Sequence, residues 1–121
     1  MTTCVLIVED DIRLRDLFAR QLGEAGYDTV VAGGAEEAKR ALATREIDLV
    51  ATDILMENGD GLELLITLRR EYPEIRSIAF TGCGNQLYLD SAKGLGADSL
   101  LEKPFSATDL IREVEQLLET T

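Results

Sequence analysis

The stretch Ile47-Asp48-Leu49-Val50-Ala51-Thr52-Asp53, followed at once by Ile54-Leu55-Met56-Glu57-Asn58-Gly59-Asp60-Gly61, decides the fold of this chain. Its first part is an apolar run of strand length, and the Asn and Gly residues of its second part are typical of a turn. Asp53 is therefore expected at the carboxyl end of a strand, where open α/β sheets bind their ligands. An isolated Asp in this place more often simply ends a strand, so the rest of the chain has to decide between the two interpretations.

Four other segments are predicted to be strands besides residues 47–52, namely 4–8, 27–32, 76–81 and 98–101. Residues 4–8 are apolar without alternation, which is typical of a strand covered on both faces. Apolar residues at helical spacing follow each strand and indicate amphipathic helices. Strands and helices that alternate five times predict one parallel sheet wrapped on both faces, a doubly wound α/β fold with strand order 2-1-3-4-5.

Several residues are suited to begin or end the predicted helices. Asp10 or Asp11 can cap the first helix, Asp60 can cap the third, and Ser106 with Asp109 forms a capping-box-like pair before the last. The helix expected within residues 85–96 has the weakest signal, because its two glycines each cost about 1 kcal/mol inside a helix.

Composition bounds the class of protein. The 121 residues fit one domain, residues 1–121, with 45% hydrophobic and 29% charged residues, as in soluble globular proteins. With no membrane-length apolar run and no signal-type start, we expect no membrane association and a cytoplasmic location. The net charge of −11 opposes direct binding to nucleic acid, and the absence of His excludes His-based catalytic triads.

Three carboxylates meet at the predicted switch point of the sheet: Glu9 and Asp10 follow the first strand, and Asp53 ends the third. Like charges this close raise one another's pKa, so the cluster is unfavourable unless it takes up a cation or a proton. A divalent cation is the simpler solution, and an all-oxygen ligand set favours Mg²⁺ over zinc or copper. Thr81 ends the fourth strand and Lys103 follows the fifth, which brings a hydroxyl and an amine to the same edge.

This set of residues resembles the response-regulator receiver domain over nearly the whole chain. The motifs that carry the resemblance are highly specific as a set: Glu9-Asp10, Asp53, Asp60-Gly61, Thr81 and Lys103-Pro104-Phe105. The resemblance implies a flavodoxin-like fold similar to that of the chemotaxis regulator CheY. It also implies a phosphoacceptor function in two-component signalling.

By this resemblance, Asp53 would accept a phosphoryl group from a sensor histidine kinase or a phosphotransfer protein. The Mg²⁺ ligands would be Asp53, Asp10, Glu9 through water and the Leu55 backbone carbonyl. Lys103 and Mg²⁺ would neutralise charge on the transferred group, which is how proteins mainly catalyse phosphoryl transfer. The chain would catalyse its own phosphorylation and dephosphorylation as a signalling domain, and would not be a metabolic enzyme.

The resemblance also implies a switch. Thr81 would hydrogen-bond the phosphoryl group and pull its loop, which would shift the surface of helix four, strand five and helix five toward a state that a downstream protein recognises. Two positions depart from the family pattern: Glu57 stands where Pro is usual, and Leu100 stands where an aromatic switch residue is common.

Other functions remain open at this point. A phosphorylation-independent interaction module with the same fold is the main alternative. A flavin or nucleotide site would need a phosphate-cradling loop after the first strand, where this chain has acids. An aspartate-based phosphatase would place a second Asp two residues after the nucleophile, where this chain has Leu55.

The side chain of Leu55 gives a first testable prediction. Leu55 and Cys83 flank the site at positions that, in the family, admit or exclude attacking water, and their apolar character predicts slow hydrolysis of the phosphoryl group. We expect the substitution Leu55→Asn to accelerate the decay of the acyl phosphate relative to wild type, measured as loss of phosphorylated protein with time. An unchanged decay rate would contradict this interpretation.

Overall fold

The computed structural model describes residues 2–56, 59–82, 84 and 86–119, with backbone alone for Gly59 and Asp60. It contains a five-stranded parallel sheet in the order β2-β1-β3-β6-β7. The strands are β1 (Cys4–Val8), β2 (Asp28–Ala32), β3 (Leu49–Asp53), β6 (Arg76–Gly82) and β7 (Ser99–Lys103). Because β6 and β7 are the fourth and fifth strands of this sheet, the predicted order 2-1-3-4-5 is confirmed.

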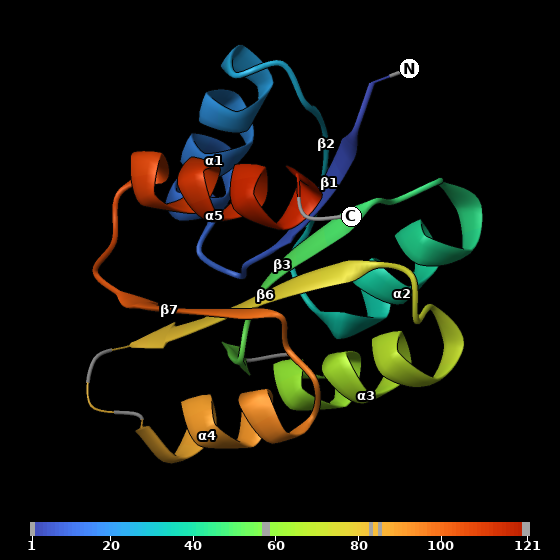
Figure 1. Cartoon of the computed structure of the whole chain (residues 1–121), viewed down its shortest axis with the longest axis vertical. Helices are drawn as coiled ribbons and strands as arrows, with labels where there is room; N and C mark the ends of the chain where they lie inside the picture. Colours follow the sequence, from blue (N-terminus) through green and yellow to red (C-terminus); the bar gives the residue numbers. More distant parts are fainter. Residues whose placement is uncertain (1, 57–58, 83, 85, 120–121) are drawn as a thin grey trace.

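Five helices cover the two faces of the sheet. They are α1 (Ile12–Glu24), α2 (Ala35–Thr44), α3 (Gly61–Glu71), α4 (Gln86–Gly94) and α5 (Ala107–Glu119). Figure 1 shows α1 and α5 on one face and α2, α3 and α4 on the other. The predicted doubly wound, flavodoxin-like α/β fold is therefore confirmed.

The buried residues of β1 explain why its sequence does not alternate. All five residues of this strand are buried, and successive side chains enter opposite cores. Leu6 and Val8 pack in the core beneath α2, α3 and α4, whereas Val5 and Ile7 pack with Phe18 in the core beneath α1 and α5. Because both faces of this strand are dry, every position in it has to be apolar.

Capping groups fix the ends of two helices. Of the two candidates, Asp11 caps α1, since its Oδ1 accepts hydrogen bonds from the N–H groups of Arg13 and Leu14 at 3.0 and 3.4 Å. Ser106 and Asp109 form the expected reciprocal pair ahead of α5, with N···O distances of 3.0 and 3.1 Å. These bonds hold the pKa of the Asp109 carboxyl below its ordinary value.

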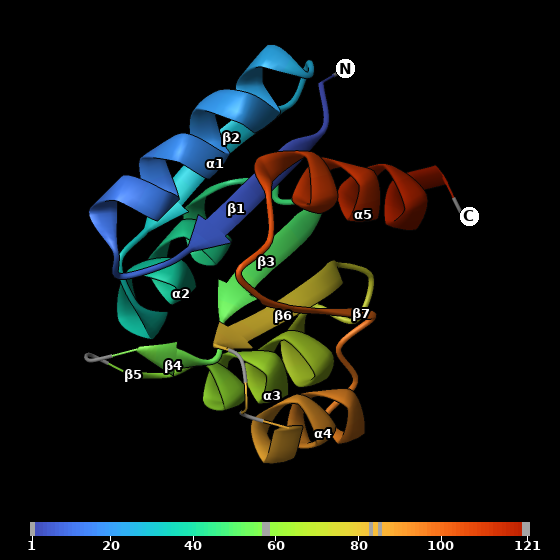
Figure 2. The same ribbon diagram turned by 90° about the vertical axis from the view of Figure 1, so that its left-hand side faces the viewer.

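A short antiparallel hairpin replaces the simple turn that was expected after Asp53. Its strands, β4 (Leu55–Met56) and β5 (Gly59–Asp60), pair directly with one another. Figure 2 shows this β4–β5 hairpin beside the edge of the sheet where β1, β3 and β6 end. Two-residue strands carry too few positions for a periodic signal, which is why the sequence did not predict them. The predicted Asp60 cap and Glu57 lie outside the described side chains.

Polar residues also extend two strands beyond their predicted ends. Asp53 is the last residue of β3, and Lys103 is the last residue of β7, where the prediction ended the fifth strand at Leu101.

Within residues 85–96, where the helix signal in the sequence was weakest, α4 forms from Gln86 to Gly94. Gly96 lies after this helix with a φ of 99°. Within the described residues no helix is long and apolar enough to cross a membrane.

The burial of Leu22 gives a prediction about stability. Leu22 in α1 is fully buried, whereas Leu87 in α4 is 77% exposed. We expect Leu22→Ala to lower the free energy of unfolding by about 2 to 5 kcal/mol through lost burial and a residual cavity. The control Leu87→Ala should change it by less than about 0.5 kcal/mol. Urea unfolding followed by circular dichroism measures both, and equal losses would contradict the assignment of the core.

Candidate acidic site at the carboxyl edge of the sheet

Glu9 and Asp53 meet because β1 and β3 are neighbours in the sheet. The register pairs Val8 with Thr52, so the residues that follow come side by side. Carboxylate oxygens of Glu9, Asp10 and Asp53 all lie within 4.8 Å of one another. The convergence of the three acids that was expected from the strand order is therefore present in the fold.

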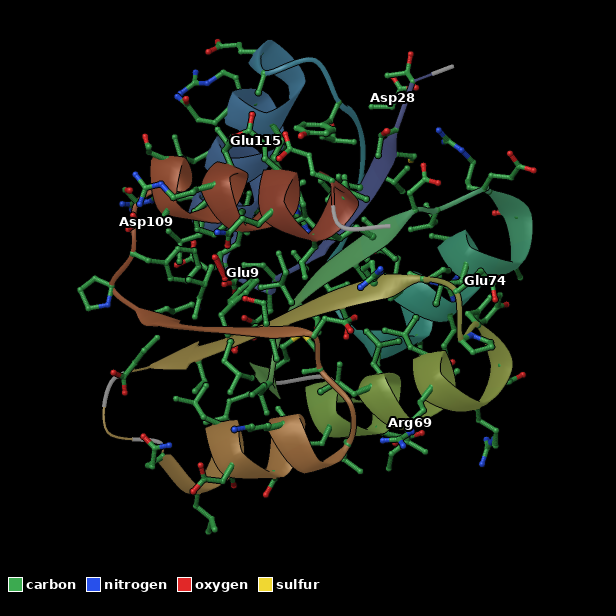
Figure 3. All side chains as sticks on the ribbon, viewed as in Figure 1. Glu9, Asp28, Arg69, Glu74, Asp109 and Glu115 are labelled. Atoms are coloured by element: carbon green, nitrogen blue, oxygen red, sulfur yellow. The ribbon has the colours of Figure 1, made fainter. Side chains whose placement is uncertain are left out.

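Burial distinguishes these acids from the many solvated carboxylates of the chain. Glu9 is 1% exposed and Asp53 is 4% exposed. In Figure 3, Glu9 lies between α5 and the strands, while the labelled Glu74 lies at the edge of the molecule. A charged carboxylate in such a place needs a partner, because desolvation is costly for an unpaired ion.

Lys103 supplies that partner. Its Nζ lies 2.7 Å from Glu9 Oε1 and 2.7 Å from Asp53 Oδ2, so one ammonium donates to both acids. The ammonium also lies 5.7 Å from the centroid of the Phe80 ring, within the range of a cation–π contact. Lys103 reaches the acids from β7, which is separated from β3 by the intervening strand β6.

The titration of this cluster reflects two opposing effects. Burial raises the pKa of Glu9, and the hydrogen bonds from Lys103 and from the Asp11 N–H counteract this only in part. For Lys103, burial by itself lowers the pKa, but the hydrogen bonds with Asp53 and Glu9 outweigh it and raise the pKa above its ordinary value. Lys103 is therefore charged at neutral pH.

Asp53 is fixed by the chain that follows it. Its Oδ1 accepts a hydrogen bond from the Leu55 N–H at 3.0 Å, while Oδ2 faces Lys103. Leu55 begins β4 two residues after Asp53, and its side chain is 42% exposed. The two carboxylate oxygens of Asp53 therefore have different partners, a main-chain amide and an ammonium.

Thr81 is buried in β6, the neighbour of β3, and follows Phe80, which pairs with Asp53. Its Oγ1 has no hydrogen-bond partner among the residues that the structure describes, and Arg15 Nε is the other such buried side-chain atom. A buried hydroxyl without a partner is uncommon in native folds, so this hydroxyl keeps an unused capacity to form a hydrogen bond.

The residues of the cluster fit a divalent cation. Glu9, Asp10 and Asp53 carry three negative charges and Lys103 carries one positive charge, which leaves a formal charge of about −2. All the side-chain donors are oxygen atoms, the type that Mg²⁺ prefers. Charge and donor type together support the predicted Mg²⁺ site.

An aromatic cluster behind Lys103 was missed by sequence reasoning. Phe18 stacks on Phe105 with a centroid distance of 5.3 Å, and Phe80 contacts both rings edge-on at 6.2 and 5.3 Å. All three phenylalanines of the chain therefore pack together beneath α1 and α5. The one sequence feature that could have indicated this cluster was the position of Phe80 directly before the predicted site residue Thr81.

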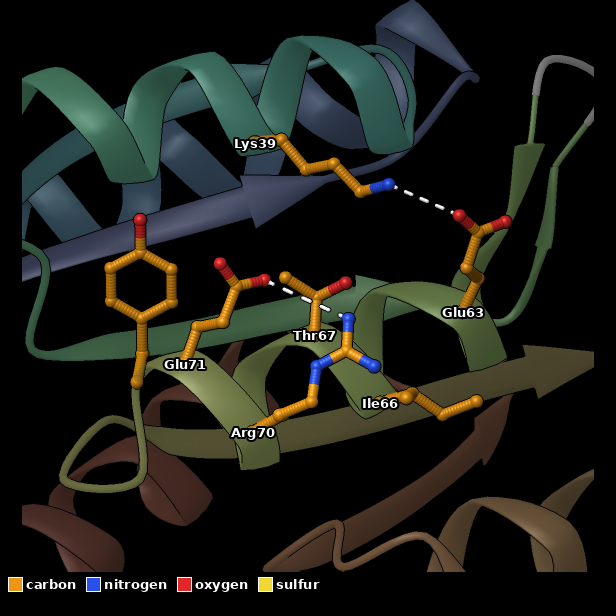
Figure 4. A pocket seen from close by; sticks show the side chains of 7 residues that line it. Lys39, Glu63, Ile66, Thr67, Arg70 and Glu71 are labelled. Carbon is orange, nitrogen blue, oxygen red and sulfur yellow. Dashed lines mark hydrogen bonds and ion pairs between the residues drawn. The ribbon is translucent and has the colours of Figure 1, made fainter.

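A surface hollow between α2 and α3 lies apart from this chemistry. Figure 4 shows Lys39 of α2 bridging to Glu63 of α3 at 3.1 Å across it, with Arg70 and Glu71 farther along α3. None of the predicted site residues lines this hollow. We therefore place the candidate site at the acidic edge of the sheet.

Comparison with known proteins decides the family. A family model described as the response regulator receiver domain matches residues 5–115. The chain belongs to this family. The prediction of a two-component receiver domain is thus confirmed, and the relatives do not favour the phosphorylation-independent alternative.

Relatives support the same conclusion over nearly the full receiver domain. The nitrogen assimilation regulatory protein NtrX of Azorhizobium caulinodans is 36% identical over 118 residues, 96% of this chain and 26% of that protein. The transcriptional regulatory protein AruR of Pseudomonas aeruginosa is 36% identical over 125 residues, 98% of this chain and 50% of that protein. The receiver domain thus spans a quarter to a half of the length of these two relatives.

Solved structures give the same fold. The receiver domain of NtrX from Brucella abortus has a TM-score of 0.91 and 37% identity, covering 97% of this chain and 99% of that one. A CheY-like receiver domain from Methanospirillum hungatei has a TM-score of 0.93 and 26% identity, covering 98% and 95%. As a family, receiver domains depend on Mg²⁺ and interact with histidine kinases and downstream effector domains.

The raised pKa of Glu9 predicts how the metal-free receiver domain responds to pH. The folded chain binds a proton at Glu9 more tightly than the unfolded chain does. The stability that Glu9 contributes is therefore complete below its ordinary pKa of 4.5 and is lost as the pH rises through the raised value. Between about pH 4.5 and neutral pH, we expect wild type to lose free energy of unfolding relative to Glu9→Gln.

Urea unfolding at a series of pH values, with a chelator present, tests this expectation. The gap between the two proteins should widen toward neutral pH. Parallel stability curves for wild type and Glu9→Gln across this range would contradict the electrostatic assignment of Glu9.

Proposed function

We propose that Asp53 is the phosphoacceptor of this receiver domain and takes a phosphoryl group from a phosphohistidine of a sensor histidine kinase or a phosphotransfer protein. The observation that carries the proposal is the Lys103 ammonium held at 2.7 Å from both Glu9 and Asp53, next to a third carboxylate. This arrangement joins a nucleophile to a fixed positive charge. Phosphoryl transfer requires little more from a protein than such positioning and charge neutralisation.

The reaction itself is a displacement at phosphorus. A carboxylate oxygen of Asp53 forms the new O–P bond as the N–P bond of the phosphohistidine breaks, and the electron pair of that bond stays on the imidazole nitrogen. Lys103 stabilises the negative charge on the phosphoryl oxygens, since its raised pKa keeps it protonated. The Leu55 N–H holds one oxygen of Asp53 and so limits the rotation of the carboxylate.

Glu9, Asp10, Asp53 and the Leu55 carbonyl would hold Mg²⁺ in this proposal. The bound cation supplies charge neutralisation for the phosphoryl oxygens. The burial of Glu9 and Asp53 supports this assignment, because an acidic cluster in a dry site with a residual negative charge is a poor resting state without a counter-ion.

Thr81 would report phosphorylation to the rest of the domain. Its buried hydroxyl donates to a phosphoryl oxygen once Asp53 is modified, which draws in the loop after β6. Gly84, which follows β6, donates its N–H to Glu102 Oε2 of β7 at 3.2 Å in the present structure. A movement of the loop therefore has to rearrange its contact with β7.

The surface that changes is proposed to be the α4–β7–α5 face, where a downstream protein docks. Leu87 and Tyr88 of α4 are 77% and 37% exposed and offer apolar contacts. Leu100, at the position of the common aromatic switch, is half-buried against the core beneath α4 and packs as an aliphatic residue. The proposed switch therefore acts through Thr81 and the segment that follows it, with an aliphatic residue at position 100.

The proposed setting is the cytoplasm, where a two-component kinase has access to ATP. We propose no direct contact with nucleic acid, because a net charge of −11 repels phosphate backbones. The relative NtrC of Azospirillum brasilense is a DNA-binding transcriptional regulator, and this chain matches 24% of its length.

Phosphorylation of Asp53 is tested by mass. Wild type incubated with Mg²⁺ and acetyl phosphate should gain the mass of one phosphoryl group, and Asp53→Asn should gain none because an amide is not a nucleophile of this kind. Intact-protein mass spectrometry makes the measurement. Asp16→Asn, which changes an exposed carboxylate of α1, is the matched control and should be phosphorylated at the wild-type rate.

Two outcomes would contradict the proposal. If the wild-type protein gains no mass in the presence of Mg²⁺, the result favours the alternative of a phosphorylation-independent interaction module. A mass gain that persists in Asp53→Asn would place the modification elsewhere. Removal of Mg²⁺ with a chelator should suppress the gain in wild type.

A further inference from the structure

Gly61, the first residue of α3, lies against the backbone that carries Asp53. A Cβ atom on Gly61 would lie 2.2 Å from the Asp53 carbonyl oxygen, 2.7 Å from Ile54 Cα and 3.0 Å from the Asp53 carbonyl carbon. All three neighbours are main-chain atoms, so the clash cannot be relieved by the movement of a flexible side chain. Any residue larger than glycine has to push the backbone of residues 53 and 54 away from α3.

Gly61 is needed for space and not for an unusual conformation. The described glycines with positive φ are Gly26, Gly84 and Gly96, and Gly61 is not among them. An alanine could therefore adopt the backbone angles of this helical position. The close approach alone excludes it.

Three hydrogen bonds hold the backbone of Asp53 and Ile54. The Gly61 N–H donates to the Ile54 carbonyl at 2.9 Å, and the Ile54 N–H donates to the Phe80 carbonyl at 2.9 Å. The Thr52 hydroxyl donates to the Asp53 carbonyl, also at 2.9 Å. The backbone is therefore held by β6, by a buried hydroxyl and by the start of α3, so a displacement of residues 53 and 54 has to strain these hydrogen bonds.

The same few atoms set the geometry of the proposed phosphoacceptor. Leu55 N–H, which follows directly, donates to Asp53 Oδ1 at 3.0 Å, and Asp53 Oδ2 lies 2.7 Å from Lys103 Nζ. A shift of residues 53 and 54 displaces the Asp53 carboxylate relative to the Leu55 N–H and to Lys103, so both contacts are disturbed. It also moves the Leu55 carbonyl, the backbone ligand assigned to Mg²⁺.

We propose that Gly61 is a positioning residue for phosphoryl transfer: its missing side chain lets α3 press on the Asp53 peptide and so fixes the Asp53 carboxylate against Leu55 N–H and Lys103. This inference rests on the proposed function of Asp53. Misplacement of a reacting group by about 1 Å costs roughly a hundredfold in rate, so an added methyl group should be costly here.

The chain provides a matched control. Gly23 lies inside α1, and a Cβ there would meet no atom within 4 Å. Gly61→Ala and Gly23→Ala both add one methyl group to a helix. Only the methyl group at position 61 clashes with neighbouring backbone atoms. We expect the rate constant for phosphorylation by acetyl phosphate at saturating Mg²⁺ to fall about a hundredfold in Gly61→Ala and to stay at the wild-type value in Gly23→Ala.

Amide exchange of metal-free protein provides a readout that does not depend on phosphorylation. In Gly61→Ala, the Leu55 amide should exchange faster because its bond to Asp53 Oδ1 is stretched, while amides in the centre of β1 keep their wild-type protection. A purely structural role would raise exchange throughout the domain. Gly61→Ala with wild-type phosphorylation, or with uniformly raised exchange, would overturn the proposal.

The two hypotheses can fail separately. If wild type is not phosphorylated, the proposed function fails, and the Leu55 amide alone decides whether Gly61 positions Asp53. If Gly61→Ala does not fold, the same two measurements are made on Thr52→Val, which removes the hydrogen bond from the Thr52 hydroxyl to the Asp53 carbonyl. Slower phosphorylation and faster Leu55 exchange in that variant support the clamp, and wild-type values overturn it.

Discussion

The bridge from the Lys103 ammonium to Glu9 and Asp53 is the interaction on which the site depends. Two carboxylates that are almost completely buried lie side by side at 2.7 Å from the same nitrogen. Without this cation, each acid would bear its own desolvation cost and the repulsion of the other. With it, the three acids and Lys103 together still have a formal charge of about −2, which supports the proposed binding of a divalent cation.

The sheet explains why these groups come together at all. Four different strand ends supply the acids, the hydroxyl and the amine, and strands that run in parallel place their carboxyl ends at one edge. The strict burial of β1 and β3 fixes their register, because a shift by one residue would exchange the two cores. The relative positions of the side chains in the site therefore depend on apolar packing in the two cores, some distance away from the site.

Strand order and the convergence of Glu9, Asp10 and Asp53 could be predicted from the sequence, because these acids stand at the ends of largely apolar runs that alternate with helical patterns. The choice between Asp10 and Asp11 as the cap of α1 could not, since both residue types cap equally well and only the backbone path selects Asp11. The β4–β5 hairpin was missed because its two-residue strands are too short to show a period, and the inclusion of Lys103 in β7 depends on its long-range pairing with Gly82. The contact of Gly61 with the Asp53 carbonyl is a matter of interatomic distance, which a one-letter sequence does not contain.

The excess charge of the acidic cluster has a consequence for the lifetime of the protein. Any cation that binds the cluster in the folded chain, and not in the unfolded chain, shifts the folding equilibrium by mass action, by about 2.7 kcal/mol at a hundred times its dissociation constant. A gain of that size reduces the fraction of unfolded molecules by roughly a hundredfold. Because proteases act on open molecules, binding of the proposed cation to this acidic cluster would also slow the degradation of the chain.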